Sequence, residues 1–195
     1  MRDPNAPDAT YEDLKKVPDN LIAQIVEGTL ITMPRPATGH ARVATQLSGE
    51  LHGPFDRGRG GPGGWTFLIE PEIHFPRNIL VPDIAGWRLE RMPRPPPPET
   101  AFLTLAPDWV CEVLSPRTAS IDRIQKRRVH AREKVAFMWH IEPLDRVLTA
   151  YALEGADYRE LGAWGGDEDT VVRVAPFDAI ELDLTTLWAP RPAEP

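Results

Sequence analysis

The chain has 195 residues, of which 42% are hydrophobic, so its length and composition fit one domain with a buried core. The 29 acidic and 22 basic residues give a formal net charge of −7, which argues against a basic nucleic-acid coat protein but allows an enzyme with one positive face. The single cysteine predicts neither an internal disulfide nor a cysteine-rich zinc site. The chain has no apolar run of the roughly 18 residues that a membrane helix needs, and its polar N-terminus does not resemble a secretory signal. We therefore expect a cytoplasmic protein without a membrane partner.

The first predicted elements are an arm and a hairpin. Residues 1–20 predict a flexible arm with one helical turn near residues 11–16. Residues 21–33 are rich in β-forming residues and are divided by Glu27-Gly28. A glycine after an acidic residue, between two apolar runs, is typical of a hairpin turn. We therefore expect an N-terminal β-hairpin.

A helix is predicted over residues 38–52, with Thr38 as its N-cap. The side chains that recur at helical spacing and define its inner face are His40, Val43, Ala44, Leu47 and Leu51. The glycine-rich run that follows, residues 58–64, lacks the Gly-Lys-Ser/Thr ending of a nucleotide-binding loop. It therefore predicts a flexible turn.

Two strands are predicted next, over residues 65–75 and residues 79–87. In the first strand, alternation places Phe67, Ile69, Ile73 and Phe75 on one side and Glu70, Glu72 and His74 on the other. The second strand carries Pro82-Asp83. The proline-dense run over residues 91–98 predicts an extended loop, because proline fits neither a helix interior nor a central strand.

The second half of the chain predicts a strand, a helix and further strands. Residues 109–114 form an apolar strand interrupted by Glu112, and residues 120–134 form a helix. Three more strands are expected over residues 136–141, 147–153 and 158–161. The segment over residues 180–188 is expected to pack back on the body, and residues 189–195 are expected to form a loose tail. We therefore expect a single domain over residues 21–188.

Two carboxylates and a lysine carry the chemistry of this pattern. Asp83 and Glu112 each lie inside an apolar strand, where a carboxylate is costly unless it is paired or binds a metal. Two carboxylates on neighbouring strands would form a hard oxygen site that suits Mg²⁺ or Mn²⁺. Lys126, on the helix that follows, would reach back and offset charge in a transition state.

Each of these residues also has an ordinary structural interpretation. A single acidic residue in a strand commonly faces solvent, and a lysine among helix arginines commonly forms a solvated charge. Asp122 and Lys126 also lie four residues apart, which is a favourable helix pair. The order of Asp83, Glu112 and Lys126, with their intervening elements, favours the catalytic interpretation.

Three ordered segments carry a resemblance to a known family. They are Leu-Val-Pro-Asp-Ile-Ala at residues 80–85, Ala-Pro-Asp-Trp-Val-Cys-Glu-Val-Leu-Ser-Pro at residues 106–116, and Asp-Arg-Ile-Gln-Lys-Arg at residues 122–127. Shorter matches lie at residues 25–30, at residues 33–36 together with His40, and at residues 138–143. Over roughly residues 20 to 155 the chain resembles the Uma-two family of restriction-endonuclease-like proteins.

The resemblance implies an α+β (α/β) fold with a PD-(D/E)XK restriction-endonuclease-like core, in which helices flank a central mixed β-sheet and an extra N-terminal hairpin is added. It implies that Asp83 and Glu112 hold Mg²⁺ or Mn²⁺ with the backbone carbonyl of Val113. The usual lysine position, two residues after the acid, is Leu114, so the family points to Lys126 instead.

The same resemblance places His40 and Glu27 near the site in accessory roles. His40 also fits a hydrogen-bonded core histidine, and this alternative stays open. The chain departs from the family pattern at three positions, namely Gln24 where an acidic residue is common, His130 where a tyrosine is usual, and Glu133 where a glycine is common.

The resulting functional hypothesis is a metal-dependent DNA endonuclease. Arg123, Arg127 and Arg128, in a basic cluster that runs from Arg117 to Lys134, would contact nucleic-acid phosphates, although the same cluster fits a solvated helix face. The alternative is a catalytically degenerate module that binds nucleic acid or protein on the same fold. RNA as substrate stays open, and a homodimer would match a two-fold duplex substrate.

Overall fold

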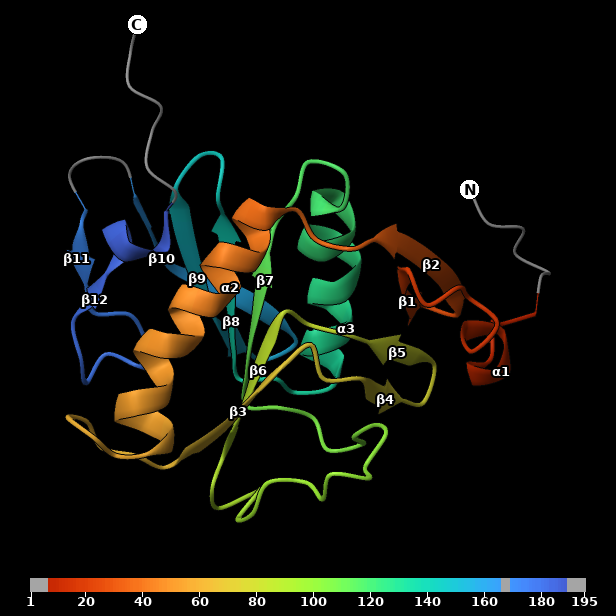
Figure 1. The fold of residues 1–195 in the computed structure, drawn as a ribbon, viewed down its shortest axis with the longest axis horizontal. Helices are drawn as coiled ribbons and strands as arrows, with labels where there is room; N and C mark the ends of the chain where they lie inside the picture. Colours follow the sequence, from red (N-terminus) through yellow and green to blue (C-terminus); the bar gives the residue numbers. More distant parts are fainter. Residues whose placement is uncertain (1–6, 166–168, 189–195) are drawn as a thin grey trace, which may run out of the picture.

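The computed structural model describes residues 7–165 and residues 169–188 as an α+β fold (Figure 1). Its centre is a six-stranded sheet of order β10-β9-β8-β7-β6-β3, in which β7 and β8 are parallel and the other neighbours antiparallel. Its strands are β3 (Trp65–Ile69), β6 (Ile84–Arg88), β7 (Trp109–Val113), β8 (Phe137–Glu142), β9 (Val147–Glu154) and β10 (Asp157–Gly165). The predicted central mixed sheet is confirmed.

Two helical layers cover opposite faces of this sheet. On one face, α2 (Thr38–Leu51) continues into the π-helix η1 (His52–Asp56). On the other, the π-helix η2 (Ile121–Lys126) continues into α3 (Arg127–Arg132). The predicted N-cap Thr38 is wrong, because Ala37 occupies the cap position and provides no side-chain hydrogen bond.

Strand alternation in β7 divides the core between these layers. Trp109, Cys111 and Val113 pack in the cluster beneath α2, whereas Val110 packs in the cluster beneath α3. Glu112 is two residues after Val110 in the same strand, so its side chain points to the same face and its carboxylate lies on the α3 side of the sheet. The apolar strand predicted from the sequence thus positions an acid beneath the basic helix.

A second sheet of order β2-β1-β5-β4 lies beside the central one (Figure 1). Its strands are β1 (Leu21–Val26), β2 (Thr29–Pro34), β4 (Ile73–Phe75) and β5 (Asn78–Leu80). Glu27 and Gly28 join β1 to β2 with φ of 51° and 73°, the pair of positive values that a tight type I′ hairpin turn requires. The predicted hairpin is confirmed.

The N-terminal helix α1 (Tyr11–Leu14) packs beside this second sheet. The backbone N–H of Ala9 donates to the carbonyl of Gly28, and the Tyr11 ring contacts His74 with centroids 4.7 Å apart. The predicted helical turn is therefore present. Residues 1–6 of the predicted arm and the predicted tail over residues 189–195 lie outside the described residues.

Both strands predicted between residues 65 and 87 are wrong as continuous strands, because each passes from one sheet to the other. The first divides into β3 and β4 at Glu70, whose φ is 48°, and Pro71 follows. The second divides into β5 and β6 around Pro82. Proline has no N–H for a sheet ladder, so strand pairing stops where the chain changes sheets.

The C-terminal segment packs back on the core as predicted. It contains β11 (Val171–Val172), β12 (Leu182–Asp183) and the 3₁₀-helix η3 (Leu184–Leu187). Leu182, Leu184 and Leu187 are buried in the cluster beneath α2. No helix among the described residues is long and apolar enough to span a membrane.

Candidate functional site

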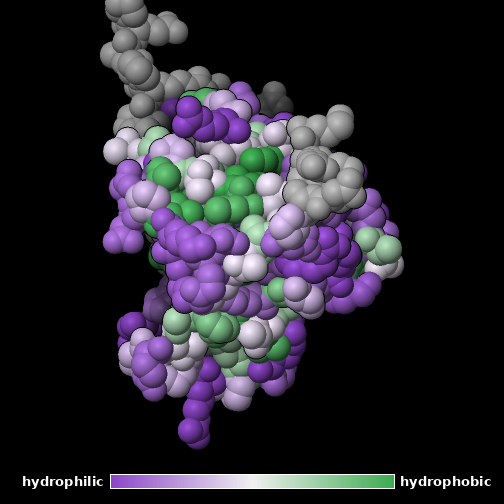
Figure 2. Space-filling model, turned by 90° about the vertical axis from the view of Figure 1, so that its right-hand side faces the viewer, coloured by the Kyte–Doolittle hydropathy of each residue, from purple (hydrophilic) through white to green (hydrophobic). Residues whose placement is uncertain are grey.

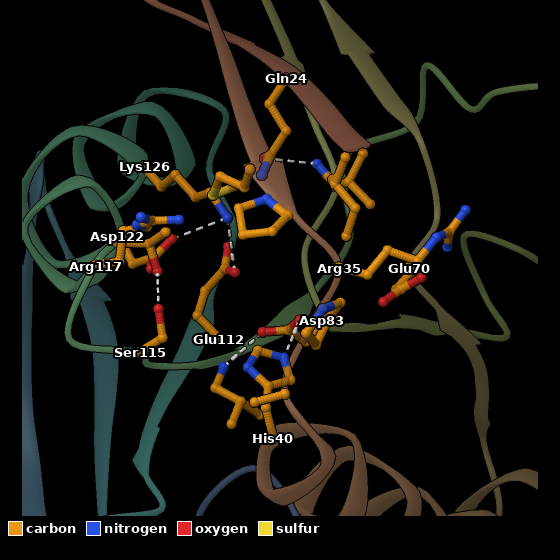
Figure 3. Close-up of a pocket in the computed structure, with 18 residues that line it drawn as sticks. Gln24, Arg35, His40, Glu70, Asp83, Glu112, Ser115, Arg117, Asp122 and Lys126 are labelled. Carbon is orange, nitrogen blue, oxygen red and sulfur yellow. Dashed lines mark hydrogen bonds and ion pairs between the residues drawn. The ribbon is translucent and has the colours of Figure 1, made fainter. Parts of the chain in front are cut away.

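A pocket of about 320 Å³ lies where the hairpin, the start of α2, the carboxyl end of β7 and helix η2 meet (Figure 3). Its charged and imidazole lining residues are Arg35, His40, Glu70, Asp83, Glu112, Arg117, Asp122 and Lys126. The three residues predicted to be catalytic, Asp83, Glu112 and Lys126, thus lie in one pocket. His40 and Val113 line it as well.

Asp83 is held by two donors from different layers of the fold. His40 Nε2 lies 2.7 Å from Asp83 Oδ1, and the backbone N–H of Val113 donates to Oδ2 at 2.7 Å. These contacts fix the carboxylate at the break between β5 and β6. The side chains of His40 and Asp83 are each 16% exposed, so both remain accessible from the pocket.

The His40–Asp83 contact also sets the charge of the imidazole. Burial acts to lower the pKa of His40, but the hydrogen bond and the charge of Asp83 outweigh it, and the net pKa is raised. The carboxylates of Glu112 and Glu70 act in the same direction. His40 is therefore more readily protonated than a free histidine.

Glu112 and Lys126 form a buried ion pair on the α3 face of the sheet. Lys126 Nζ donates to Glu112 Oε2 at 2.9 Å and lies 3.0 Å from Asp122 Oδ1. His130 Nε2 lies 3.4 Å from the other Glu112 oxygen. Because residues 122, 126 and 130 succeed one another every four positions, the helix aligns them along one side.

Burial acts to lower the pKa of Lys126, but the surrounding carboxylates of Glu112, Asp122 and Asp83 reverse this effect and raise it above the usual value. The ammonium group is therefore protonated at neutral pH. It supplies a fixed positive charge and hydrogen-bond donors, and it does not act as a base.

The other predicted site residues are not brought to the pocket. Glu27 lies in the hairpin turn, where its carboxylate is 2.7 Å from Arg132 Nη1. Arg123 pairs with Glu142, and Arg127 donates to the Tyr158 carbonyl at 2.6 Å while its guanidinium stacks over the Tyr151 ring. Arg128 is exposed on the helix and is also absent from the pocket lining.

Sequence reasoning gave no role in the site to several polar residues of the pocket, among them Gln24, Arg35, Glu70 and Asp122. Gln24 Oε1 accepts a hydrogen bond from the backbone N–H of Val81 at 2.9 Å, which directs its amide NH₂ away from that contact. The spacing of Asp122 and Lys126 did predict their pairing. Its location beside Glu112 follows from the helix crossing β7, which the spacing does not encode.

The pocket offers hard oxygen donors for a divalent cation. Asp83 and Glu112 each retain lone pairs beyond those used by their hydrogen bonds, and carboxylate oxygens suit Mg²⁺ or Mn²⁺. Within residues 7–165 and 169–188, no three His, Cys, Asp or Glu side chains are gathered as a ligand set. A cation here would therefore complete its coordination with backbone or water oxygens.

Comparisons with known proteins identify the family and the fold. The Uma2 family model, described as "Putative restriction endonuclease", matches residues 8–185. A crystal structure described as a "putative nuclease belonging to DUF820", from Anabaena variabilis ATCC 29413, superposes with a TM-score of 0.73 at 20% identity, covering 92% of this chain and 97% of that chain. That likeness confirms the predicted fold class. No curated protein matches the chain.

Proposed function

Because this chain belongs to the Uma2 family, whose model spans residues 8–185, we propose that it is a metal-dependent endonuclease that hydrolyses phosphodiester bonds in DNA. The observation that carries the proposal is the buried ammonium of Lys126 beside Glu112, in the same pocket as Asp83. A buried ammonium between the carboxylates of Glu112 and Asp122 adds little net stability to a fold. Its position at a pocket therefore favours a functional role.

In this proposal Asp83, Glu112 and the backbone carbonyl of Val113 would hold Mg²⁺ or Mn²⁺. A bound divalent ion polarises a phosphoryl oxygen and lowers the pKa of a bound water. His40 and the Val113 N–H orient Asp83. Lys126 places positive charge where the transferring phosphoryl group gains negative charge, which stabilises the transition state.

A degenerate binding module is the second candidate, and two observations favour it. Both oxygens of Glu112 already have partners, Lys126 at 2.9 Å and His130 at 3.4 Å. In addition, Gln24 stands where the family commonly carries an acid. A module of this kind would retain the fold over residues 21–188 and bind its partner without a metal.

The test is cleavage of supercoiled plasmid with Mg²⁺ or Mn²⁺. Wild type is expected to nick the plasmid, and Asp83→Asn, Glu112→Gln and Lys126→Met are each expected to reduce the rate by roughly 100-fold or more. Glu160→Gln, at an exposed position of β10, is the matched control. Equal cleavage by wild type and the three variants would exclude this site, and no cleavage by any protein would favour the binding module.

Metal binding has a readout that does not depend on cleavage. A cation that binds only the folded protein raises the melting temperature, so Mn²⁺ is expected to stabilise wild type and Glu160→Gln but neither Asp83→Asn nor Glu112→Gln. A double-strand cut would require two sites, so a homodimer is part of the proposal. Sedimentation of the DNA-bound protein measures it.

A further inference from the structure

We propose that the pocket accepts one nucleotide held outside a duplex, so that the substrate is single-stranded DNA or a single-stranded segment beside a duplex. This inference rests on the proposed function and names its substrate class. Three features support it: the depth of the charged groups, the apolar wall opposite them, and two arginines without acidic partners at the pocket.

The charged groups lie too deep for an intact duplex. Glu112 is 2% exposed and Lys126 is 3% exposed, and both lie in a pocket of only about 320 Å³. Duplex DNA is stiff, with a persistence length of about 50 nm, so its backbone does not fold into a narrow pocket. Enzymes that act on a base within a duplex extrude that nucleotide into a pocket, and an unpaired nucleotide reaches buried groups in the same way. This volume is near the lower end of the roughly 300–1,000 Å³ typical of small-molecule sites.

The wall opposite helix η2 is apolar. Ile22 and Met33 are cross-strand partners in the β1–β2 hairpin, and Pro34, Pro36 and Val81 extend the surface that they form. On the face that carries the hairpin, hydrophobic residues form the floor of a hollow bordered by hydrophilic residues (Figure 2). Such a wall suits the face of an unstacked base, which every nucleotide presents regardless of sequence.

Arg35 and Arg117 supply charge for the phosphates on either side of the bound nucleotide. Both line the pocket and are exposed, Arg35 after β2 and Arg117 after β7. Arg35 donates to the carbonyl of Asp19 at 3.0 Å. Among the described residues neither guanidinium has an ion pair, whereas Arg123, Arg127 and Arg132 are paired with Glu142, Asp157 and Glu27.

The first experiment compares three labelled substrates of one sequence: a single strand, a blunt duplex, and a duplex with a single-stranded 3′ or 5′ overhang. Cleavage with Mn²⁺ is expected to be roughly 20-fold faster or more in the single strand and the overhang than in the blunt duplex, because the duplex must first unpair. Cleavage of the overhang but not of a free single strand would assign the site to strand junctions. Equal or faster cleavage of the blunt duplex would overturn the inference and leave the proposed endonuclease intact.

Binding separates failure of this inference from failure of the proposed hydrolysis. Fluorescence anisotropy with Ca²⁺ measures affinity for the single strand and the blunt duplex without requiring cleavage. Tighter binding of the single strand without cleavage by any metal would support the inference while rejecting hydrolysis. Equal affinity for both substrates, or none for the single strand, would reject the inference.

A pocket-filling variant tests where the nucleotide lies. Ala37 lines the pocket and is exposed at the cap of α2, so Ala37→Phe adds a ring there without opening the core. It is expected to weaken single-strand binding by roughly tenfold or more, at an unchanged melting temperature, because the ring displaces a stacked base. Thr38→Phe, at the adjacent exposed residue outside the pocket lining, is the matched control.

The arginines are tested through salt dependence. For single-stranded DNA, the slope of log affinity against log salt becomes shallower by about 0.7 for each phosphate that the protein no longer neutralises. Arg35→Ala and Arg117→Ala are each expected to show that reduction, and Arg123→Ala is not. An unchanged slope in both pocket variants, or equal effects of Ala37→Phe and Thr38→Phe, would place the strand elsewhere.

Discussion

Lys126 is the residue on which the electrostatics of the pocket depend. It is 3% exposed and its ammonium lies within 3.0 Å of carboxylate oxygens from both Glu112 and Asp122. A buried charge pair adds little net stability when intact, but removing one partner leaves the other charge buried and uncompensated. The arrangement therefore stabilises the fold only as a complete set.

The first prediction is a double-mutant cycle between Lys126 and Asp122. Lys126→Met is expected to reduce the free energy of unfolding by about 3 kcal/mol, because two buried carboxylates lose their cation. Adding Asp122→Asn removes one of those charges and is expected to recover about 1 kcal/mol or more. Urea denaturation at pH 7 measures all four proteins, and strictly additive effects would show that the two side chains do not interact in solution.

His140 contributes a pH dependence from a buried position outside the pocket lining. Burial lowers the pKa of this β8 histidine to about 4, against 6.5 in a free side chain, and its Nε2 atom has no hydrogen-bond partner among the described residues. The unfolded chain therefore binds more protons between pH 6.5 and pH 4. The stability contributed by the neutral imidazole is present above about pH 6.5 and is lost as the pH falls toward 4.

The second prediction follows from that direction. As the pH is lowered from about 7 to about 4, protonation of His140 is expected to reduce the free energy of unfolding of wild type by about 3 kcal/mol. This follows from about 1.4 kcal/mol for each pH unit between the two pKa values. His140→Leu is expected to lose this part of the pH dependence. Thr149→Val, at the buried β9 neighbour paired with His140, is the control that should retain it. Identical pH profiles for His140→Leu and wild type would contradict the prediction.

At the scale of elements, the sequence predicts identity and order better than it predicts strand ends. The hairpin, α2, β7 and the strands β8, β9 and β10 follow from local periodicity and turn residues, which act over a few positions. The breaks inside residues 65–75 and residues 79–87 do not, because a strand that crosses between two sheets keeps β-forming residues on both sides. Only Pro71 and Pro82 signalled those breaks.

The same limit applies to the pocket. Asp83 and Glu112 stood out because a carboxylate within an apolar strand requires an explanation. Arg117 was predicted only as one member of a basic cluster, and Arg35 only as part of a short family match. An arginine beside prolines in a loop is ordinary until the fold brings two such loops together. The sequence predicted that Glu27 lies in a hairpin turn. It did not predict that the Glu27 side chain lies away from the pocket, because this depends on how the hairpin packs against the rest of the fold.

The third prediction concerns the hairpin as an element. Asn78 on β5 is 4% exposed, and its Oδ1 accepts a hydrogen bond from the Glu27 backbone N–H at 2.7 Å. Asn78→Ala leaves that N–H unsatisfied and is expected to cost about 1–2 kcal/mol. Because the hairpin forms the apolar wall of the pocket, hydrogen exchange over residues 21–34 is expected to accelerate more than exchange in β7 and β8.

Thr32→Ala, at an exposed position of the same hairpin, is the control for this experiment. It should leave exchange over residues 21–34 near the wild-type rate. Uniform acceleration across the whole chain in Asn78→Ala would mean that the hairpin opens only with global unfolding.

At the scale of the whole molecule, the C-terminal segment completes the core beneath α2. The Phe177 ring lies 4.8 to 5.5 Å, between centroids, from rings on η1, β3, β7 and β8. Trp139 Nε1 donates to the Ala175 carbonyl at 2.9 Å. Residues far apart in the chain thus pack in one aromatic cluster, which connects η1, the central sheet and the C-terminal segment.

The fourth prediction is that Phe177 is a principal determinant of global stability. It is 2% exposed, and Phe177→Ala removes a ring that contacts four separate elements, so the free energy of unfolding is expected to fall by about 3–5 kcal/mol. Val171→Ala, at a position 53% exposed on β11, is expected to change it by less than about 0.5 kcal/mol. Urea denaturation followed by tryptophan fluorescence measures both, since Trp65, Trp109 and Trp139 border Phe177. A loss below about 1 kcal/mol in Phe177→Ala would mean that the sheet and helices hold together without the C-terminal segment. If the expected loss occurs and the folded fraction of the variant still binds Mn²⁺ like wild type, the residues that stabilise the fold are distinct from those that form the pocket.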